Sequence, residues 1–192
     1  MAFKINEFRS SFVAGGEPAS PANYEVSVLR KYLVPLVAGD KYRFENDVKF
    51  RCISCSLPGR LLNTTDRSTY GPNRKIVTSA LYQDVTFSFI VSNDKNELNY
   101  FEEWHNFIVD NNVNAESDGF SHDVAYYDDY VGDITISLID VKSEKKNRIK
   151  YTISLLEAYP ISVEEIPLSW DNNNEFIRVN VTVAYRNWVQ KI

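Results

Sequence analysis

The chain has 192 residues and a formal net charge of −5, with 14% aromatic residues and only 7 glycines and 7 prolines. This composition excludes a disordered or collagen-like chain, and the length suits a single domain with a substantial core. The acidic balance argues against a sequence-independent nucleic-acid binder, which needs a basic face to release counterions from phosphate.

Apolar stretches of this chain are too short to cross a membrane. The longest uncharged ones, such as Tyr32–Gly39 and Val85–Ser92, fall far short of the roughly 18 residues that a spanning helix needs. Lys4, Glu7 and Arg9 interrupt the first residues, so no secretory signal core is expected. We therefore expect a protein that is made in a cytoplasm and has no membrane partner.

The first part of the chain predicts an arm followed by short strands. Glycine and proline punctuate residues 1–22, which suits an arm. Apolar and polar residues alternate over residues 24–28 and predict the first strand, and residues 44–55 predict one or two more. Residues 60–72 are polar and have no apolar period, which predicts a loop of roughly thirteen residues, a length that is usually functional.

Cys52 and Cys55 form a CxxC pair, a spacing that raises the question of a redox or zinc site. In an alternating strand, however, residues three apart point to opposite faces. No second CxxC pair or nearby histidine completes a zinc shell. We therefore predict two free, mostly buried thiols and neither a metal nor a cofactor.

One helix is predicted directly after a strand at residues 85–91. Asp94 suits its N-cap, and Glu97 three residues later completes a capping-box pattern. Apolar side chains at helical spacing are Leu98, Phe101, Trp104 and Ile108. The helix should therefore cover one open face or end of the sheet.

The second half of the chain predicts an excursion, a hairpin and a closing strand. Residues 114–132 are acidic and aromatic and predict an exposed excursion. Residues 134–138 and 149–155 alternate and predict a long hairpin with a charged tip. Apolar and polar residues alternate over residues 176–188 and predict a single closing strand with one buried face and one solvated face. This strand would be longer than the common length of about five to six residues.

Catalytic residues are scarce. The two histidines, His105 and His122, leave little choice for a nucleophilic triad. Acidic residues around His122 could ligate a hard cation, but their spacing does not match an EF-hand loop, so we predict no metal. The turn at residues 170–175 would also suit a sugar-binding sandwich, so a carbohydrate-binding or hydrolytic β-sandwich is an alternative of another class.

Several segments follow one another in a characteristic order. They are Phe8 and Phe12, residues 50–58, residues 73–76, the strand and helix of residues 84–108, Tyr159-Pro160, a short apolar strand at residues 163–168, the turn Trp170-Asp171-Asn172-Asn173-Asn174-Glu175 and the closing strand. This order resembles that of the tail tube proteins of contractile-tailed bacteriophages. Residues 31–47 and 114–133 depart from the family pattern, and we interpret them as divergent loops of a single domain, residues 1–192.

The resemblance implies a mainly β fold with one helix, an antiparallel β-sandwich whose long strands join those of neighbouring protomers into a continuous β-barrel ring. It implies a homo-hexamer that stacks into the inner tail tube of a virion and conducts DNA during ejection without binding it specifically. Implied partners are the tail sheath, baseplate and tail terminator proteins, and no enzymatic activity is implied. A baseplate tube initiator and a type VI secretion tube protein share this fold and remain alternatives.

Three groups of residues are candidates for these roles. Candidate inter-subunit contacts are Phe8, Phe12, Asn63, Thr64, Thr65, Asp66, Arg74 and Lys75. Candidate structural residues are Trp104, Trp170 and Trp188, and we expect at least one of the last two to be buried at the end of the sheet. Candidate acids facing a lumen are Asp47, Asp84, Asp140 and Glu157.

Overall fold

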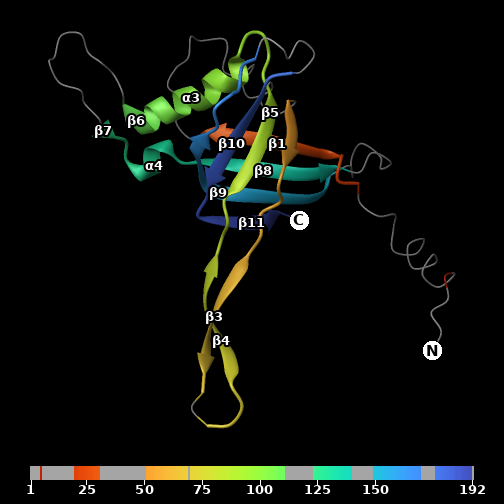
Figure 1. Ribbon diagram of the computed structural model, residues 1–192, viewed down its shortest axis with the longest axis vertical. Coiled ribbons are helices and arrows are strands. Elements are labelled where there is room, and N and C mark those ends of the chain that lie inside the picture. Colours follow the sequence, from red (N-terminus) through yellow and green to blue (C-terminus); the bar gives the residue numbers. More distant parts are fainter. Residues whose placement is uncertain are drawn as a thin grey trace.

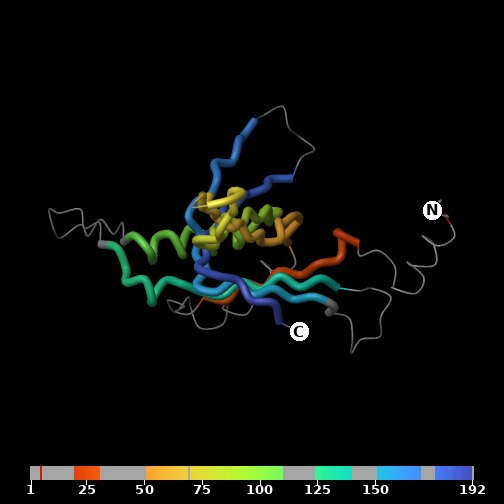
Figure 2. The backbone as a smooth tube through the Cα atoms, turned by 90° about the horizontal axis from the view of Figure 1, so that it is seen from below, coloured from red at the N-terminus to blue at the C-terminus, as the bar shows by residue number. Residues whose placement is uncertain are grey.

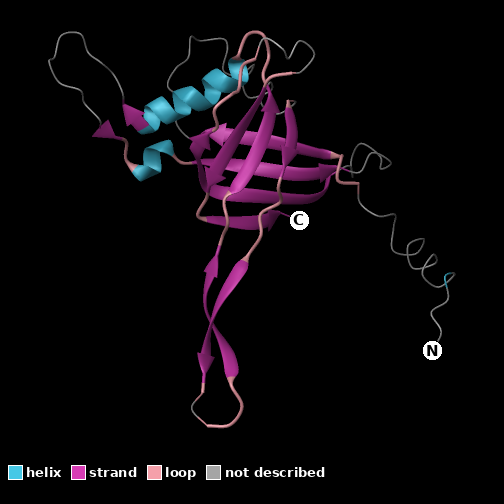
Figure 3. Cartoon of the chain, viewed as in Figure 1, coloured by secondary structure: helices cyan, strands magenta, loops and turns pink. Residues whose placement is uncertain are grey.

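The chain folds into a mainly β body from which one long hairpin projects (Figures 1 and 3). The computed structural model describes residues 5, 20–30, 51–68, 70–110, 123–139, 149–169 and 176–191. Its elements are β1 (Tyr24–Arg30), β2 (Cys52–Cys55), β3 (Leu61–Arg67), β4 (Arg74–Leu81), β5 (Val85–Ile90), α3 (Asn96–Ile108), β6 (Val109–Asp110), β7 (Asp123–Val124), α4 (Tyr127–Tyr130), β8 (Gly132–Ile139), β9 (Ile149–Val163), β10 (Arg178–Ala184) and β11 (Asn187–Lys191).

The body consists of two antiparallel sheets that share one strand. The first sheet has the order β1-β8-β9-β11, and the second has the order β9-β10-β5-β2. Figure 2 shows them as two layers. The predicted mainly β fold with one substantial helix is therefore confirmed, as are the strand at residues 24–28 and the pairing of residues 134–138 with 149–155.

Strand β9 passes from one sheet into the other. Its first ten residues, 149–158, pair with β8 and β11, and residues 159–163 pair with β10. The change falls at Glu157, whose φ of 54° lies in the left-handed region. A non-glycine residue in that conformation turns the strand sharply, which brings the two sheets face to face.

The predicted single closing strand is wrong, because the chain breaks at Tyr185 and Arg186. Strand β10 stays in the second sheet, while β11 pairs with β9 in the first. The register of β10 against β9 also shifts between Thr182 and Val183, and such a bulge bends a strand. The predicted short strand at residues 163–168 is also wrong, since β9 ends at Val163 and no strand follows it there.

The core lies between the two sheets and under helix α3. Alternating side chains of β5 and β10 point into it, with Phe87, Phe89, Val179, Val181 and Val183 all buried. Helix α3 adds Tyr100, Phe101 and Trp104, and the rings of Phe89 and Phe101 lie 5.2 Å apart. The buried face predicted for the closing strand is therefore present in β10.

Helix α3 begins without the predicted Asp94 cap. Lys95 precedes the helix with a left-handed φ of 55°, and no side chain caps the helix there. This turn directs the Glu97 side chain back to Ser92. The backbone nitrogen and the hydroxyl of Ser92 both donate hydrogen bonds to the Glu97 carboxylate at 2.9 Å. Arg51, next to β2, forms an ion pair with the same carboxylate. Glu97 therefore joins the helix to the second sheet. No helix within the described ranges is long and apolar enough to span a membrane.

The bulge in β2 overturns the prediction that the two cysteines point to opposite faces. The register of β2 against β5 shifts between Cys52 and Ser54, so that Cys52 lies opposite Phe89 and Cys55 opposite Phe87. Both cysteines are half-buried, and the two residues between them are exposed. The thiols are free, as predicted, but they share one face.

Replacing Glu97 should test the connection between helix and sheet. Burial alone would raise the pKa of Glu97, but hydrogen bonds from Ser92 and the charge of Arg51 outweigh it and lower the pKa. A depressed pKa contributes stability that is present above the unfolded value, about 4.3, and is lost as the pH falls through the folded value. Glu97→Gln should therefore reduce the free energy of unfolding by about 1–3 kcal/mol at neutral pH.

Urea denaturation between neutral and acidic pH measures this loss, and Glu102→Gln on the exposed side of the helix is the matched control. The difference between wild type and Glu97→Gln should shrink as the pH falls. An equal destabilisation by both variants would contradict the role of Glu97.

Candidate assembly surfaces

The hairpin of β3 and β4 is the most exposed pair of strands in the described part of the chain. It extends from the body along the longest axis (Figure 1), and every residue of both strands is exposed. The loop predicted at residues 60–72 is therefore wrong, because residues 61–67 form a strand that pairs with residues 74–81. Neither face of this hairpin packs on the core, so its side chains lack the alternation by which a strand is recognised in a sequence.

Six of the eight predicted contact residues lie together on this hairpin. Asp66 lies opposite Lys75 and Thr65 opposite Ile76, while Asn63 and Thr64 follow toward the body. Side chains also cross between the strands, since Asn63 Nδ2 donates to Ser79 Oγ at 3.2 Å. Arg74 lies opposite Arg67 at the far end. Phe8 and Phe12 lie outside the described residues.

Aromatic rings hold the root of the hairpin to the body. The guanidinium carbon of Arg60 lies 4.7 Å from the ring centroid of Trp188 and 5.7 Å from that of Tyr82. The ring of Tyr82 in turn lies 6.1 Å from that of Tyr185, at the break between β10 and β11. Cation–π contacts of this kind contribute about 0.5–1 kcal/mol at exposed sites. The root is therefore anchored, whereas every residue of β3 and β4 beyond it is exposed.

Several apolar side chains on the hairpin are exposed. They are Leu61, Leu62, Ile76, Val77 and Leu81, between 43% and 54% exposed. An isolated two-stranded hairpin is marginally stable in water, and contiguous exposed apolar surface marks sites of protein contact. The hairpin therefore has the properties of an arm that another surface covers.

Open sheet edges are the second candidate surface. Among the described strands, β1 and β11 each pair with one neighbour in the first sheet, and β2 pairs with β5 alone in the second. Unpaired backbone groups at an edge can accept a strand of another chain. The body therefore offers strand edges as well as a projecting arm.

Two of the four candidate lumen acids are described. Asp84 is exposed in the turn between β4 and β5. The Glu157 carboxylate forms an ion pair with Arg186 at 2.7 Å and accepts a hydrogen bond from the Tyr127 hydroxyl at 3.2 Å. Glu157 lies where β9 passes from one sheet to the other. Its charge is thus paired at the surface, while Asp84 is the stronger candidate. Asp47 and Asp140 lie outside the described residues.

The tryptophans and histidines have mainly structural surroundings. Trp104 is fully buried and donates from Nε1 to the Tyr130 carbonyl at 2.8 Å. Trp188 is half-buried, and Trp170 lies outside the described part of the chain. His105 Nε2 lies 3.2 Å from the Pro160 carbonyl oxygen, and His122 is not among the described residues. Within the described ranges, no cluster of three or more His, Cys, Asp or Glu residues could hold a metal.

Comparison with known families agrees with this arrangement. The phage tail tube protein family matches residues 19–191, and the chain belongs to this family. As a tail tube protein it is a structural component and not an enzyme. No curated protein matches the chain.

Similar solved structures come from contractile assemblies. A chain of the anti-feeding prophage baseplate matches with 13% identity and a TM-score of 0.61, covering 92% of this chain and 97% of that one. A chain of an extracellular contractile injection system, its PVC sheath-tube complex in the extended state, matches with 18% identity and a TM-score of 0.60, covering 99% of each chain. The sheath/tube terminator of that system matches with 17% identity and a TM-score of 0.60, covering 92% and 99%. These similarities show a shared fold.

The two described tryptophans should differ in their effect on stability. Trp104→Ala removes a fully buried side chain and its hydrogen bond, and should lower the free energy of unfolding by about 3–5 kcal/mol. Trp188→Ala removes a half-buried ring at the hairpin root and should cost less. Thermal unfolding followed by circular dichroism measures both, and a melt of the Trp104 variant that equals wild type would contradict its place in the core.

Proposed function

We propose that this chain is the protomer of a hexameric ring that stacks into the inner tube of a contractile tail. Family membership supports a tube protein, and the fold it shares with chains of contractile assemblies supports the contractile class. The hairpin of β3 and β4 carries the proposal, since a wholly exposed arm with an apolar surface requires a partner. Identical rings provide such a partner at every level of a stack.

Within a ring, the open edges would join neighbouring protomers. Strands β1 and β2 end the two sheets, and each has one side without a partner among the described strands. Closure of six copies would pair such edges into a continuous β-barrel and remove the aggregation hazard that free edges carry. The resulting tube would meet the sheath on its outside and the baseplate and terminator proteins at its ends.

Between rings, the hairpin would reach the next copy. Its root is fixed to the body by Arg60, Trp188 and Tyr82, while its outer residues are all exposed. The next ring would cover Leu61, Leu62 and Leu81, which lies opposite Leu61, near the root of the hairpin. The polar pairs further out, including Asp66 and Lys75, would set the register of one ring on the next.

Shortening the hairpin tests this contact. Leu62 lies opposite Ala80, so replacing residues 63–79 by Asn-Gly closes the remaining strands with a two-residue turn. The body should keep its stability to within about 1 kcal/mol, because the removed residues pack on nothing in it. Electron microscopy should then show soluble protein or single rings where wild type forms tubes.

A paired point variant refines the test. Ile76→Ser with Val77→Ser should also weaken stacking, whereas Leu168→Ser, at a site 81% exposed and outside the hairpin, is the control. Tubes of unchanged length from the shortened variant would refute an inter-ring role for the hairpin.

The interior of the tube would conduct DNA without holding it. Each chain carries a net charge of −5, so six copies carry about −30, and an acidic bore would repel phosphate weakly. Basic side chains on the bore would instead multiply over the stacked rings into a salt-dependent trap. Asp84, exposed at the start of β5, is the described candidate for a bore acid.

DNA binding by purified tubes tests the conduit. Wild-type tubes should not bind short duplex DNA at physiological salt. Tubes of Asp84→Lys should bind it, and the binding should weaken as salt rises. Asp94→Lys makes the same change of charge at the exposed start of the helix and is the matched control. Tight binding by wild type, or equal behaviour of the two variants, would contradict an acidic bore at Asp84.

Initiation of the tube at the baseplate is the second candidate function. The fold shared with a chain of the anti-feeding prophage baseplate favours a role in initiation. A tube initiator should form single rings, whereas a tube protein should grow long tubes from the same purified chain.

A further inference from the structure

Strand β2 brings its two cysteines to one place by means of its bulge. Cys52 and Cys55 lie opposite Phe89 and Phe87, which are two positions apart on β5. Three steps along β2 are thus compressed into two steps along its partner. Ile53, the extra residue, and Ser54 are exposed, and the cysteines are half-buried on the side that faces the core.

The compressed spacing suits a disulfide. Two steps along a strand cover about 6.6 Å, at roughly 3.3 Å per residue. Disulfides join residues whose Cα atoms are roughly 4.4 to 6.8 Å apart, whereas three steps of a regular strand cover about 10 Å and cannot be bridged. The bulge therefore makes a bond possible that an unbroken strand would forbid.

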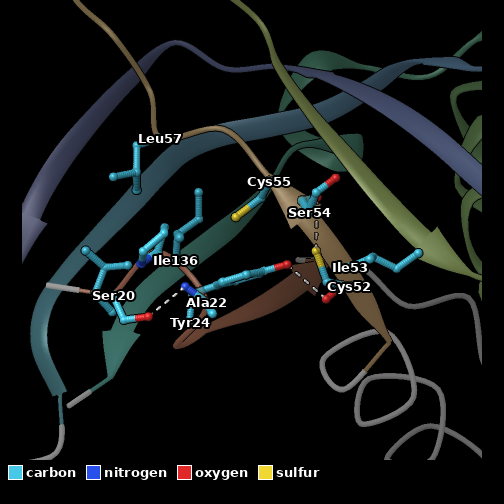
Figure 4. A pocket seen from close by; sticks show the side chains of 11 residues that line it. Ser20, Ala22, Tyr24, Cys52, Ile53, Ser54, Cys55, Leu57 and Ile136 are labelled. Atoms are coloured by element: carbon cyan, nitrogen blue, oxygen red, sulfur yellow. Dashed lines mark hydrogen bonds between the residues drawn. The ribbon is translucent and has the colours of Figure 1, made fainter. Parts of the chain in front are cut away.

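Both thiols lie beside a hollow at the open side of the two sheets. It measures about 830 Å³ and is lined by residues of β1, β2 and β8 and of the segments that adjoin β1 and β2, among them Tyr24, Cys52, Cys55 and Ile136 (Figure 4). The Tyr24 hydroxyl donates to the Cys52 carbonyl at 3.2 Å and holds β2 beside β1. Ligand sites of about 300–1,000 Å³ admit small organic molecules, so a low-molecular-weight disulfide has room to reach the pair.

The two sulfurs have different reactivities. A hydrogen bond from the Cys52 thiol lowers the pKa of Cys55. The hydrogen bond to Cys55, together with burial, raises the pKa of Cys52. The thiolate is the attacking species in thiol–disulfide exchange, so Cys55 should react first.

We propose that Cys52 and Cys55 form a reversible thiol–disulfide modification site, oxidised by a low-molecular-weight disulfide such as oxidised glutathione. The Cys55 thiolate attacks one sulfur of the reagent, the reagent's S–S bond breaks, and one thiolate leaves. Cys52 then loses its proton to solvent and attacks the Cys55 sulfur, which releases the second thiolate. The protein pair is oxidised by two electrons, and the reagent is reduced to two thiols.

The bond would fix the bulge of an edge strand. Among the described strands, β2 pairs with β5 alone, and the Tyr24 hydrogen bond links it to β1. A covalent link between Cys52 and Cys55 would hold the two-to-one register against β5 whatever lies on the other side of the strand. The site does not depend on the proposed tube function.

Mass spectrometry of the full chain tests the site. The reduced, folded protein is incubated with oxidised glutathione, quenched with acid and an alkylating reagent, and cleaved with trypsin. The peptide of residues 52–60, bounded by Arg51 and Arg60, should appear two hydrogen atoms lighter and unalkylated. Cys52→Ser should stop at a glutathione adduct on Cys55, and Cys55→Ser should form an adduct at least about tenfold more slowly.

Circular dichroism establishes that both variants are folded, so that rates are compared between intact proteins. A folded wild-type protein that keeps both thiols alkylated, or that forms only disulfides between chains, would overturn the proposal. Equal reaction rates of the two single-cysteine variants would overturn the assignment of Cys55 as the attacking thiol. Restoration of the dithiol by reduced glutathione should confirm that the modification is reversible.

Discussion

The body depends on the change of sheet within β9. This strand pairs with β8 and β11 along its first part and with β10 along its last, so it is hydrogen-bonded into both layers. Glu157 turns the strand with a left-handed φ, and Ala158 directly after it is fully buried between the layers. The break between β10 and β11 lies alongside, where the Arg186 nitrogen donates to the Leu156 carbonyl at 3.2 Å. Two neighbouring strands thus change layer together, which closes the core without a separate connection.

The rest of the molecule divides into a packed body and an arm without packing. Helix α3 closes the core with Phe101 and Trp104, and the buried Glu97 ties it to the second sheet through Arg51. The hairpin of β3 and β4 contributes no buried residue to that core, and aromatic contacts of Arg60 and Tyr82 hold its root. Its exposed apolar side chains are of the kind that marks a protein contact. This division is expected of a subunit that is stable by itself and complete only in an assembly.

β-Bulges in three strand pairs affect the course of the strands and which side chains share a face. A shift between Cys52 and Ser54 brings two thiols to one face, another lies within the hairpin between Asn63 and Thr64, and a third, opposite Thr182 and Val183, adds Ile161 to β9. In each case one strand places two residues opposite one residue of its partner, which locally bends the strand that carries the extra residue. The two thiols of β2 therefore share one face because of the way β2 pairs with β5, and the spacing of the cysteines in the sequence alone would not place them there.

The amino-acid sequence by itself determined those elements that bury one face, because burial leaves an alternation or a helical period in the chain. Val26 and Val28, Phe87 and Phe89, the apolar face of β10 and the Phe101–Trp104 face of α3 are all of this kind. The order of these elements also carried the resemblance to tail tube proteins. Only the tertiary structure decided that residues 61–67 form a strand, that the closing segment splits, that Glu97 turns to Ser92 and that the two cysteines meet. Exposed pairing, strand breaks and bulges are set by backbone partners far along the chain, and a local pattern of side chains does not record them.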